Sequence, residues 1–185
     1  MTPQVKSLGP LLVGGLVEFN VGTCYPSTVQ GKIATVEELK GMVAAAKSRG
    51  KKIVFTNGCF DLLHLGHLRL LREAKRLGDL LVVALNSDGS VKQIKGPERP
   101  IFPENERAEL IASLEMVDYV TIFEEADPKN LLSELKPDVL VKGGDWPEDQ
   151  VVGKDAVERD GGRVVVVPYL KGHSTTAIIE RMRRQ

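Results

Sequence analysis

The sequence lacks a cysteine framework, a long apolar run and an excess of either charge, and each absence excludes a class of protein. Cys24 and Cys59 are too few for a set of disulfides or metal ligands, which favours a reducing cytoplasm. The apolar run at residues 11–17 is interrupted by glycines and is shorter than the roughly 18 residues of a membrane span. Lysine plus arginine total 25, as do aspartate plus glutamate, so no net basic field attracts nucleic acid or an anionic membrane. We therefore expect a cytoplasmic protein that binds neither.

The composition is sufficient for one packed domain. The chain has 185 residues, of which 42% are hydrophobic and 27% are charged, as is typical of a soluble protein that buries a core. Residues 1–34 show scattered Gly, Pro, Ser and Thr without a sustained period, so we interpret them as an irregular arm or a remnant. Residues 35–185 are predicted to form the folded domain.

Apolar runs alternate with helical patterns along this domain. Strands are predicted at 53–55, 80–85, 119–123, 139–141 and 163–167, and helices within 35–50 and at 67–77, 104–116, 128–135 and 175–184. Continuous apolar strands separated by helices are typical of a parallel sheet covered on both faces. Right-handed crossovers then predict a Rossmann-like, doubly wound α/β fold with a five-stranded parallel sheet. Ligands of such folds bind beyond the carboxyl ends of the strands, so the candidate site lies in the loops there.

The loop after the first strand carries the clearest chemical pattern. His64 and His67 bracket Gly66 where a helix is expected to begin. A helix N-terminus offers free N–H groups, glycine lets a phosphate approach the backbone, and imidazoles donate hydrogen bonds to phosphate oxygens. The pattern predicts a polyphosphate clamp, with a surface histidine pair or half of a metal site as alternatives. The Walker and dinucleotide glycine patterns, GxxxxGK[ST] and GxGxxG, are both absent.

The loop after the second strand adds polar and basic candidates. Asn86 and Asp88 follow the strand directly, and Lys95 precedes Gly96 in what we expect to be a flexible loop. A lysine there can screen phosphate charge, although solvated loop lysines are an equally good interpretation of each one singly.

The loops after the last two predicted strands supply further candidates. Asp145 follows a pair of glycines and can accept from a ribose or base donor, or else cap a turn. Ser174, Thr175 and Thr176 precede the last predicted helix and form either a second anion site or an ordinary helix cap.

These strings resemble the nucleotidyltransferase superfamily that carries the HxGH motif. The matching segments are FTNGCFDLLHLGH, ALNSDGSVKQIKG, RPIFPENERAELIASLEMVDYV, PDVLVKGGDW and GHSTTAII. The resemblance covers residues from about 35 to the C-terminus, and within the superfamily it is greatest to the D-glycero-β-D-manno-heptose 1-phosphate adenylyltransferases. Cytidylyltransferase relatives usually have an RTxGISTT string, whereas this sequence has YLKGHSTT, and the missing arginine argues against glycerol-phosphate chemistry.

The resemblance implies a reaction and a set of site residues. AMP would pass from ATP, bound with Mg²⁺, to a sugar 1-phosphate, and pyrophosphate would leave. We assign catalysis to His64, His67 and Lys95, and no metal ligand to the protein. Nucleotide binding is assigned to Asn57, Gly58, Cys59, Phe60, Gly66, Lys142, Gly144, Asp145, Ser174, Thr175 and Thr176, and substrate binding to Asp61, Asn86 and Asp88.

The resemblance also bears on partners and on rival functions. In many relatives the domain is fused behind a sugar kinase, which implies a kinase acting earlier in the same pathway, and a homodimer is left open. Two alternatives stand beside the sugar reaction. One is a CTP-dependent polyol-phosphate cytidylyltransferase of the same fold, and the other is a nucleotide-binding module without catalysis.

Overall fold

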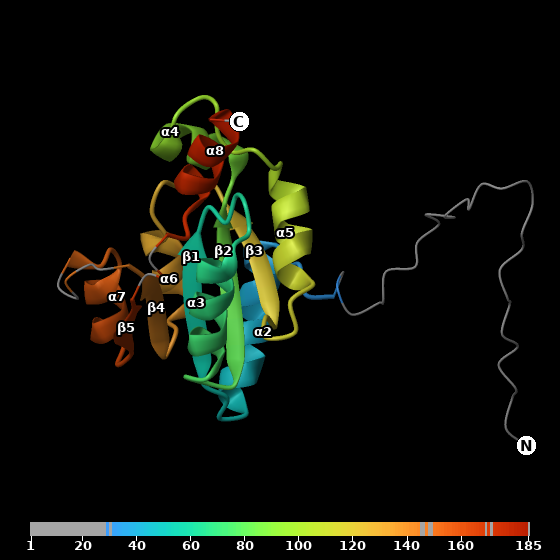
Figure 1. The fold of residues 1–185 in the computed structure, drawn as a ribbon. Coiled ribbons are helices and arrows are strands. Elements are labelled where there is room, and N and C mark those ends of the chain that lie inside the picture. The colour runs from blue at the N-terminus through green and yellow to red at the C-terminus, as the bar shows by residue number, and fades with distance from the viewer. Residues whose placement is uncertain are drawn as a thin grey trace, which may run out of the picture.

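A computed structural model of the protein describes Val29 and residues 31–144, 147, 150–168, 170 and 172–184. Five parallel strands form one sheet in the order β3-β2-β1-β4-β5 (Figure 1). Their bounds are β1 Ile53–Gly58, β2 Leu80–Asn86, β3 Tyr119–Phe123, β4 Val139–Gly143 and β5 Arg163–Val167. The prediction of a five-stranded, parallel, doubly wound sheet is therefore confirmed.

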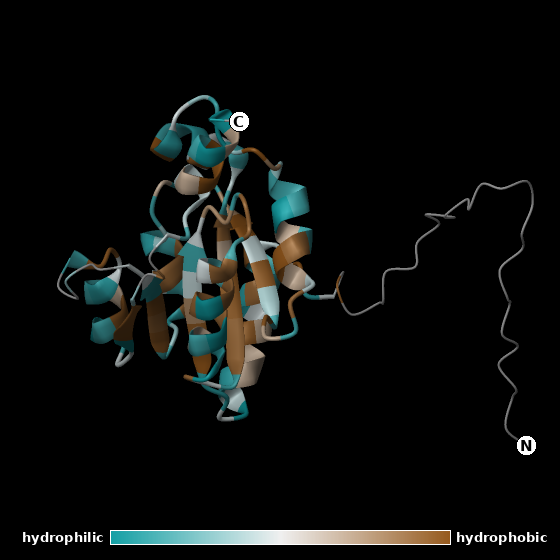
Figure 2. Ribbon diagram, in the orientation of Figure 1, coloured by the Kyte–Doolittle hydropathy of each residue, from teal (hydrophilic) through white to brown (hydrophobic). Residues whose placement is uncertain are grey.

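Helices cover both faces of this sheet. They are α2 Val36–Ser48, α3 Leu65–Lys75, α4 Asp88–Lys95, α5 Glu104–Ala112, α6 Lys129–Leu135, α7 Lys154–Arg159 and α8 Thr175–Arg183. One core cluster joins α2, α6 and α7 to the sheet, and the other joins α3 and α5 to its opposite face. Phe55 belongs to the first cluster and its neighbour Val54 to the second, so both sides of β1 are buried. Figure 2 shows the resulting pattern of hydrophobic strands beneath helices with hydrophilic outer faces.

The strand order reverses between β1 and β4, which positions the site. β1 pairs with β2 on one side and with β4 on the other, both in parallel. The crossovers leave β1 toward β2 and then return to β4, so a crevice opens at their carboxyl ends. The loops after β1, β2 and β4 meet around it, and α8 lies beside α4 at that end of the molecule (Figure 1).

Two helices near the crevice differ from the sequence prediction. α3 begins at Leu65 rather than at His67, with the extended residue His64 as its N-cap. The expected flexible loop that carries Lys95 is the helix α4, whose last residue is Lys95. The Ser87 hydroxyl accepts a hydrogen bond from the Ser90 amide and caps α4, while Val91 is buried beneath it. These two contacts outweigh the turn tendency of the Asn-Ser-Asp-Gly string.

The described part of the predicted arm covers one edge of the sheet. Ile33 forms a bridge to Val120 on β3, and the Ala34 amide donates to the Val120 carbonyl at 2.9 Å. The Val120 amide in turn donates to the Lys32 carbonyl at 2.8 Å. The remainder of the arm, residues 1–28 and Gln30, lies outside the described residues. No helix in the described part of the chain is long and apolar enough to cross a bilayer.

Candidate active site

The turn after β1 is folded tightly around one aromatic ring. Phe60 has a φ of 44°, in the left-handed region, and its ring is buried. A Cβ on Gly58 would lie 3.2 Å from that ring, so the glycine leaves room for it. The ring of Phe60 also contacts that of His67, with centroids 5.0 Å apart. This packing fixes the position of His67 from the side of the turn.

The two motif histidines are stacked at the start of α3. Their ring centroids are 3.7 Å apart, and the planes are inclined by 19°. A Cβ on Gly66 would fall 2.9 Å from Cε1 and Nδ1 of His64, closer than such atoms approach. Gly66 is therefore needed for the His64 ring to fold over the first turn of the helix. The structure brings together the predicted pair and the glycine between them.

Burial disfavours the protonated form of both imidazoles. It lowers the pKa of His67 to about 4, with a smaller contribution from His64. Burial also lowers the pKa of His64, and His173 adds to the effect. Nδ1 of each ring is buried without a hydrogen-bond partner among the described residues. A neutral imidazole has one N–H to donate, and an anion beside it would stabilise the protonated form. The pair is thus suited to receive an anionic ligand.

The start of α8 lies against this turn. The His173 carbonyl lies 3.4 Å from the place where a Gly66 side chain would begin. The Thr175 hydroxyl donates to the Leu62 carbonyl at 3.4 Å. The Ser174 hydroxyl accepts from the Ala177 amide at 3.1 Å, so it caps the helix, which is the alternative role considered for it. Thr176 is exposed.

The end of β4 contributes a half-buried lysine on the other side of β1. Lys142 donates to the Asn57 side-chain oxygen, which joins two predicted nucleotide-binding residues. Burial lowers the pKa of Lys142 to about 8, against a smaller opposite effect of Asp127. The Gly144 amide donates to the Val167 carbonyl at 3.0 Å, and Asp145 lies outside the described residues.

A cavity of about 240 Å³ adjoins the end of β4. The residues that line it are Lys142, Gly143, Gln150, Val151 and Val152. Its mixed apolar and polar lining lies where the fold places ligands, beyond the carboxyl end of a strand next to the switch in strand order.

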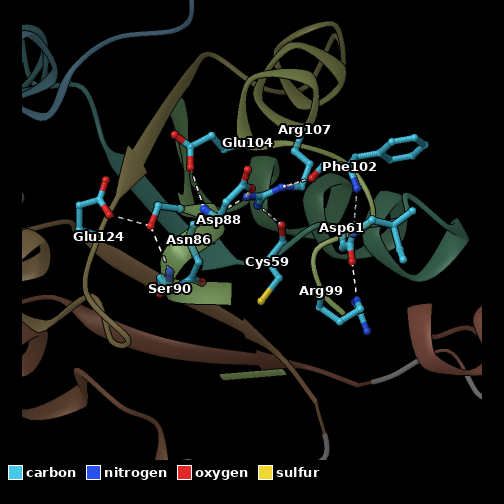
Figure 3. A network of polar contacts seen from close by, with 12 residues as sticks. Cys59, Asp61, Asn86, Asp88, Ser90, Arg99, Phe102, Glu104, Arg107 and Glu124 are labelled. Carbon is cyan, nitrogen blue, oxygen red and sulfur yellow. Dashed lines mark hydrogen bonds and ion pairs between the residues drawn. The ribbon is translucent and has the colours of Figure 1, made fainter. Parts of the chain in front are cut away.

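The three predicted substrate-binding residues are bonded within the protein (Figure 3). The Asn86 amide donates to the Ser90 hydroxyl at 2.9 Å and to the Glu125 carbonyl at 3.2 Å. Asp88 accepts from Arg107. The Asp61 side chain is 0% exposed and has no surface to offer a substrate in this structure. These side chains form the framework around the turn.

Arg107 is the residue of this framework that the sequence did not reveal. It is 0% exposed, and its Nη1 donates to the Cys59 carbonyl at 2.6 Å. Its Nη2 donates to the Asn86 carbonyl at 2.9 Å and to Asp88 at 2.8 Å. Its Nε donates to the Phe102 carbonyl at 3.0 Å. One guanidinium therefore joins the loops after β1 and β2 to the segment before α5.

Basic groups also lie near Cys59. Burial raises the pKa of the Cys59 thiol, and Lys95, Arg107 and Arg99 each oppose this rise by a smaller amount. Lys95 thus lies within electrostatic reach of the turn although it ends a helix on the β2 side. Among the described residues, no three His, Cys, Asp or Glu side chains converge as a metal site.

Comparison with known proteins agrees with this arrangement. The cytidylyltransferase-like family model matches residues 55–181, from β1 into α8. The chain belongs to the cytidylyltransferase-like family. The match includes both the HLGH turn and the start of α8, and it confirms the expected resemblance to nucleotidyltransferases.

Two curated proteins are about half identical to this chain over most of its length. The bifunctional protein HldE of Geotalea uraniireducens is 51% identical over 180 residues, 97% of this chain and 36% of that protein. HldE of Trichlorobacter lovleyi is 54% identical over 151 residues, 82% of this chain and 31% of that protein. The chain thus spans about a third of the length of these relatives.

Solved structures show the same fold. The lipopolysaccharide core biosynthesis protein from Thermoplasma volcanium is 38% identical, with a TM-score of 0.55 over 66% of this chain and 98% of that one. Pantoate-beta-alanine ligase from Francisella tularensis is 18% identical, with a TM-score of 0.53 over 83% of this chain and 79% of that one. The second likeness concerns the fold alone.

Proposed function

We propose that this chain transfers an adenylyl group from ATP to a sugar 1-phosphate, with D-glycero-β-D-manno-heptose 1-phosphate as the preferred acceptor. The main observation in support of the proposal is the stacked pair of imidazoles, His64 and His67, at the N-terminus of α3. Identity of about half to proteins named HldE supports the heptose, and the name of the Thermoplasma protein supports a lipopolysaccharide sugar.

The reaction requires one displacement at phosphorus. An oxygen of the acceptor phosphate forms a bond to the α-phosphorus of ATP, and the bond from that phosphorus to the bridging oxygen breaks. Pyrophosphate leaves with the electron pair, so atoms and charge balance without a covalent enzyme intermediate. The partly buried thiol of Cys59, whose pKa is raised, needs no part in this step. Catalysis would then consist of positioning and charge stabilisation.

Each group around the turn has a place in this proposal. His64 and His67 donate to the oxygens of the reacting phosphate, and the free amides of the first turn of α3 support them. The start of α8, which lies against the turn, holds the polyphosphate through Thr175 and Thr176. The cavity beside Lys142 takes the nucleoside, and Lys95 screens the charge between ATP and the acceptor.

Mg²⁺ belongs to the proposal as a partner of the ATP phosphates. The carboxylates nearest the turn, Asp61 and Asp88, are already bonded to Arg99 and Arg107. We therefore place the ion on phosphate oxygens rather than on these side chains. Bound there, it would neutralise part of the triphosphate charge.

The proposed acceptor also implies a preceding reaction. A sugar 1-phosphate must be made by phosphorylation, and the longer relatives are named bifunctional. We propose that a sugar kinase supplies the acceptor, in the cytoplasm where ATP is present.

Pyrophosphate release measured with crossed substrates tests the function. ATP and CTP are each combined with heptose 1-phosphate, glucose 1-phosphate and glycerol 3-phosphate, with His64→Ala as the inactive control. We expect turnover with ATP and the heptose, at least about tenfold above the other combinations. Turnover with CTP and glycerol 3-phosphate would replace the proposal with the polyol reaction. Nucleotide binding without turnover of any acceptor would favour the non-catalytic module.

A further inference from the structure

Arg99 is held by one edge of its guanidinium. Its Nε donates to the Asp61 carboxylate at 2.5 Å, and the same carboxylate accepts from the Ile101 and Phe102 amides at 2.7 and 3.1 Å. Asp61 is buried, so its charge is met by three donors rather than by water. This tether fixes the arginine beside Asp61, which lies in the turn three residues before His64.

The two terminal nitrogens of Arg99 are left for another partner. No described residue bonds to them, and the side chain is 14% exposed. In Figure 3 the guanidinium of Arg99 and the thiol of Cys59 lie on the same side of the network, away from Arg107. An arginine fixed through Nε presents its Nη1 and Nη2 groups as a fork that fits two oxygens of a phosphate.

Arg99 and the cavity proposed for the nucleoside lie on different sides of β1. Arg99 follows α4, which follows β2, whereas the cavity beside Lys142 follows β4 on the other side of β1. Lys95 ends α4, and the Arg99 amide donates to the carbonyl of the next residue, Gly96, at 3.1 Å, so the two cations lie on the same turn of the chain. Two cations thus gather on the β2 side, where a second phosphate must approach ATP against like-charge repulsion.

We propose that Arg99 binds the phosphate of the acceptor, with Lys95 as a second cation and Asp61 as the residue that positions Arg99. The inference rests on the proposed function and names a subsite within it. This role is compatible with the burial of Asp61, because Asp61 acts on the substrate by positioning Arg99 and need not contact the substrate itself.

Steady-state kinetics with ATP and the sugar 1-phosphate varied separately test the subsite. Arg99→Gln should raise the KM of the acceptor by about tenfold or more and change that of ATP by less than about twofold. Arg99→Lys keeps the charge and can still pair with Asp61 but loses the fork, so it should raise the acceptor KM by a smaller factor. Inorganic phosphate, as a competitor of the acceptor, should inhibit both variants less than it inhibits the wild type.

Matched variants separate binding from folding. Arg76→Gln makes the same change in an arginine that is 72% exposed at the far end of α3, and both KM values should stay unchanged. Asp61→Asn should raise the acceptor KM while that of ATP stays nearly constant. An equal rise in both KM values in Arg99→Gln would overturn the subsite and leave Arg99 a framework residue. If Arg99→Gln does not fold, an unchanged acceptor KM in Arg99→Lys would do the same.

The wild type is measured first, so the two proposals fail separately. Wild-type protein without turnover on any acceptor would reject the proposed function. Wild-type turnover combined with an unaltered acceptor KM in Arg99→Gln would reject the subsite alone.

Discussion

The two sides of the candidate site are built in different ways. On the β2 side, Arg107 is completely buried and bonds to three backbone carbonyls and one carboxylate. On the α8 side, the helix has no buried residue, and its start contacts the turn through a hydroxyl and a carbonyl. The first side holds its geometry through its own bonds, whereas the second depends on its helix cap and on few contacts.

Burial determines how much each contact contributes. The ion pair between Arg183 of α8 and Glu98 is short, at 2.7 Å, but both side chains are largely exposed. Such pairs contribute little, because water and salt screen them. Removal of a buried guanidinium leaves its acceptors without donors, and the desolvation cost of those groups then remains. Polar contacts of similar length therefore contribute differently to stability on the two sides.

The largest expected effect is that of Arg107→Ala. It should lower the free energy of unfolding by about 3–5 kcal/mol, because four acceptors lose their donors on a fully buried guanidinium together. Arg183→Ala, on the exposed surface of α8, should leave that free energy nearly unchanged. Urea denaturation of both variants measures the contrast. Equal losses would show that the two sides do not differ in the way the burial indicates.

The histidine pair stands between the two sides and should affect rate more than folding. His64→Ala or His67→Ala should lower kcat by about 100-fold, roughly 3 kcal/mol, if the imidazoles stabilise the transition state. The melting temperature should change little. Steady-state assays and thermal denaturation of the same preparations give both quantities. Near-normal turnover in both variants would remove the histidines from the mechanism.

The features that could be predicted are those that depend on residues close together in the sequence. Each central strand is an uninterrupted apolar run because both of its faces are covered, so the sheet could be predicted. The histidine pair could be found because HLGH is local. α4 was missed because Asn-Ser-Asp-Gly fits both a turn and a capped helix start, and the burial of Val91 decided between them.

The framework could not be predicted, because its partners are distant in the chain. Arg107 bonds to Cys59 across 48 positions, and Arg99 bonds to Asp61 across 38. The one available signal was the position of Arg107, four residues before the buried Ile111. This spacing places Arg107 on the inner face of α5. The burial of Asp61 could not be predicted either, because it depends on the bond to Arg99.

Protonation of His67 should weaken the turn at low pH. The pKa of His67 is about 4 in the folded protein, against an ordinary value of 6.5. Between these values the unfolded chain binds the proton and the native state does not, so stability rises with pH. The contribution is complete above about pH 6.5 and is lost as the pH falls toward 4, by about 2 kcal/mol between pH 7 and pH 5.

Urea unfolding at pH 7 and pH 5 measures this loss. In His67→Asn the side chain does not titrate, so the difference in unfolding free energy between the two pH values should shrink by about 2 kcal/mol. The same difference in the variant and the wild type would show that His67 is no more buried in solution than an exposed histidine.

The smallest expected effect concerns the start of α8. Thr176 is exposed, and the Thr175 hydroxyl makes only a long hydrogen bond of 3.4 Å to the Leu62 carbonyl, so a ligand could take both hydroxyls as donors with little rearrangement. Replacing both by valine keeps their size and removes both donors. At about 1 kcal/mol per neutral hydrogen bond, ATP should bind roughly tenfold more weakly.

Calorimetric titration of ATP into matched variants isolates this effect. Thr121 lies on β3, and its buried hydroxyl has no hydrogen-bond partner among the described residues. Thr121→Val removes this hydroxyl, and ATP affinity should stay the same. Ser174→Ala removes the cap and should lower stability by about 1 kcal/mol, with a smaller change in ATP affinity than the double variant shows. If the folded double variant binds ATP as tightly as the wild type, the hydroxyls serve only the helix start. The closing side would then hold the polyphosphate through backbone amides alone.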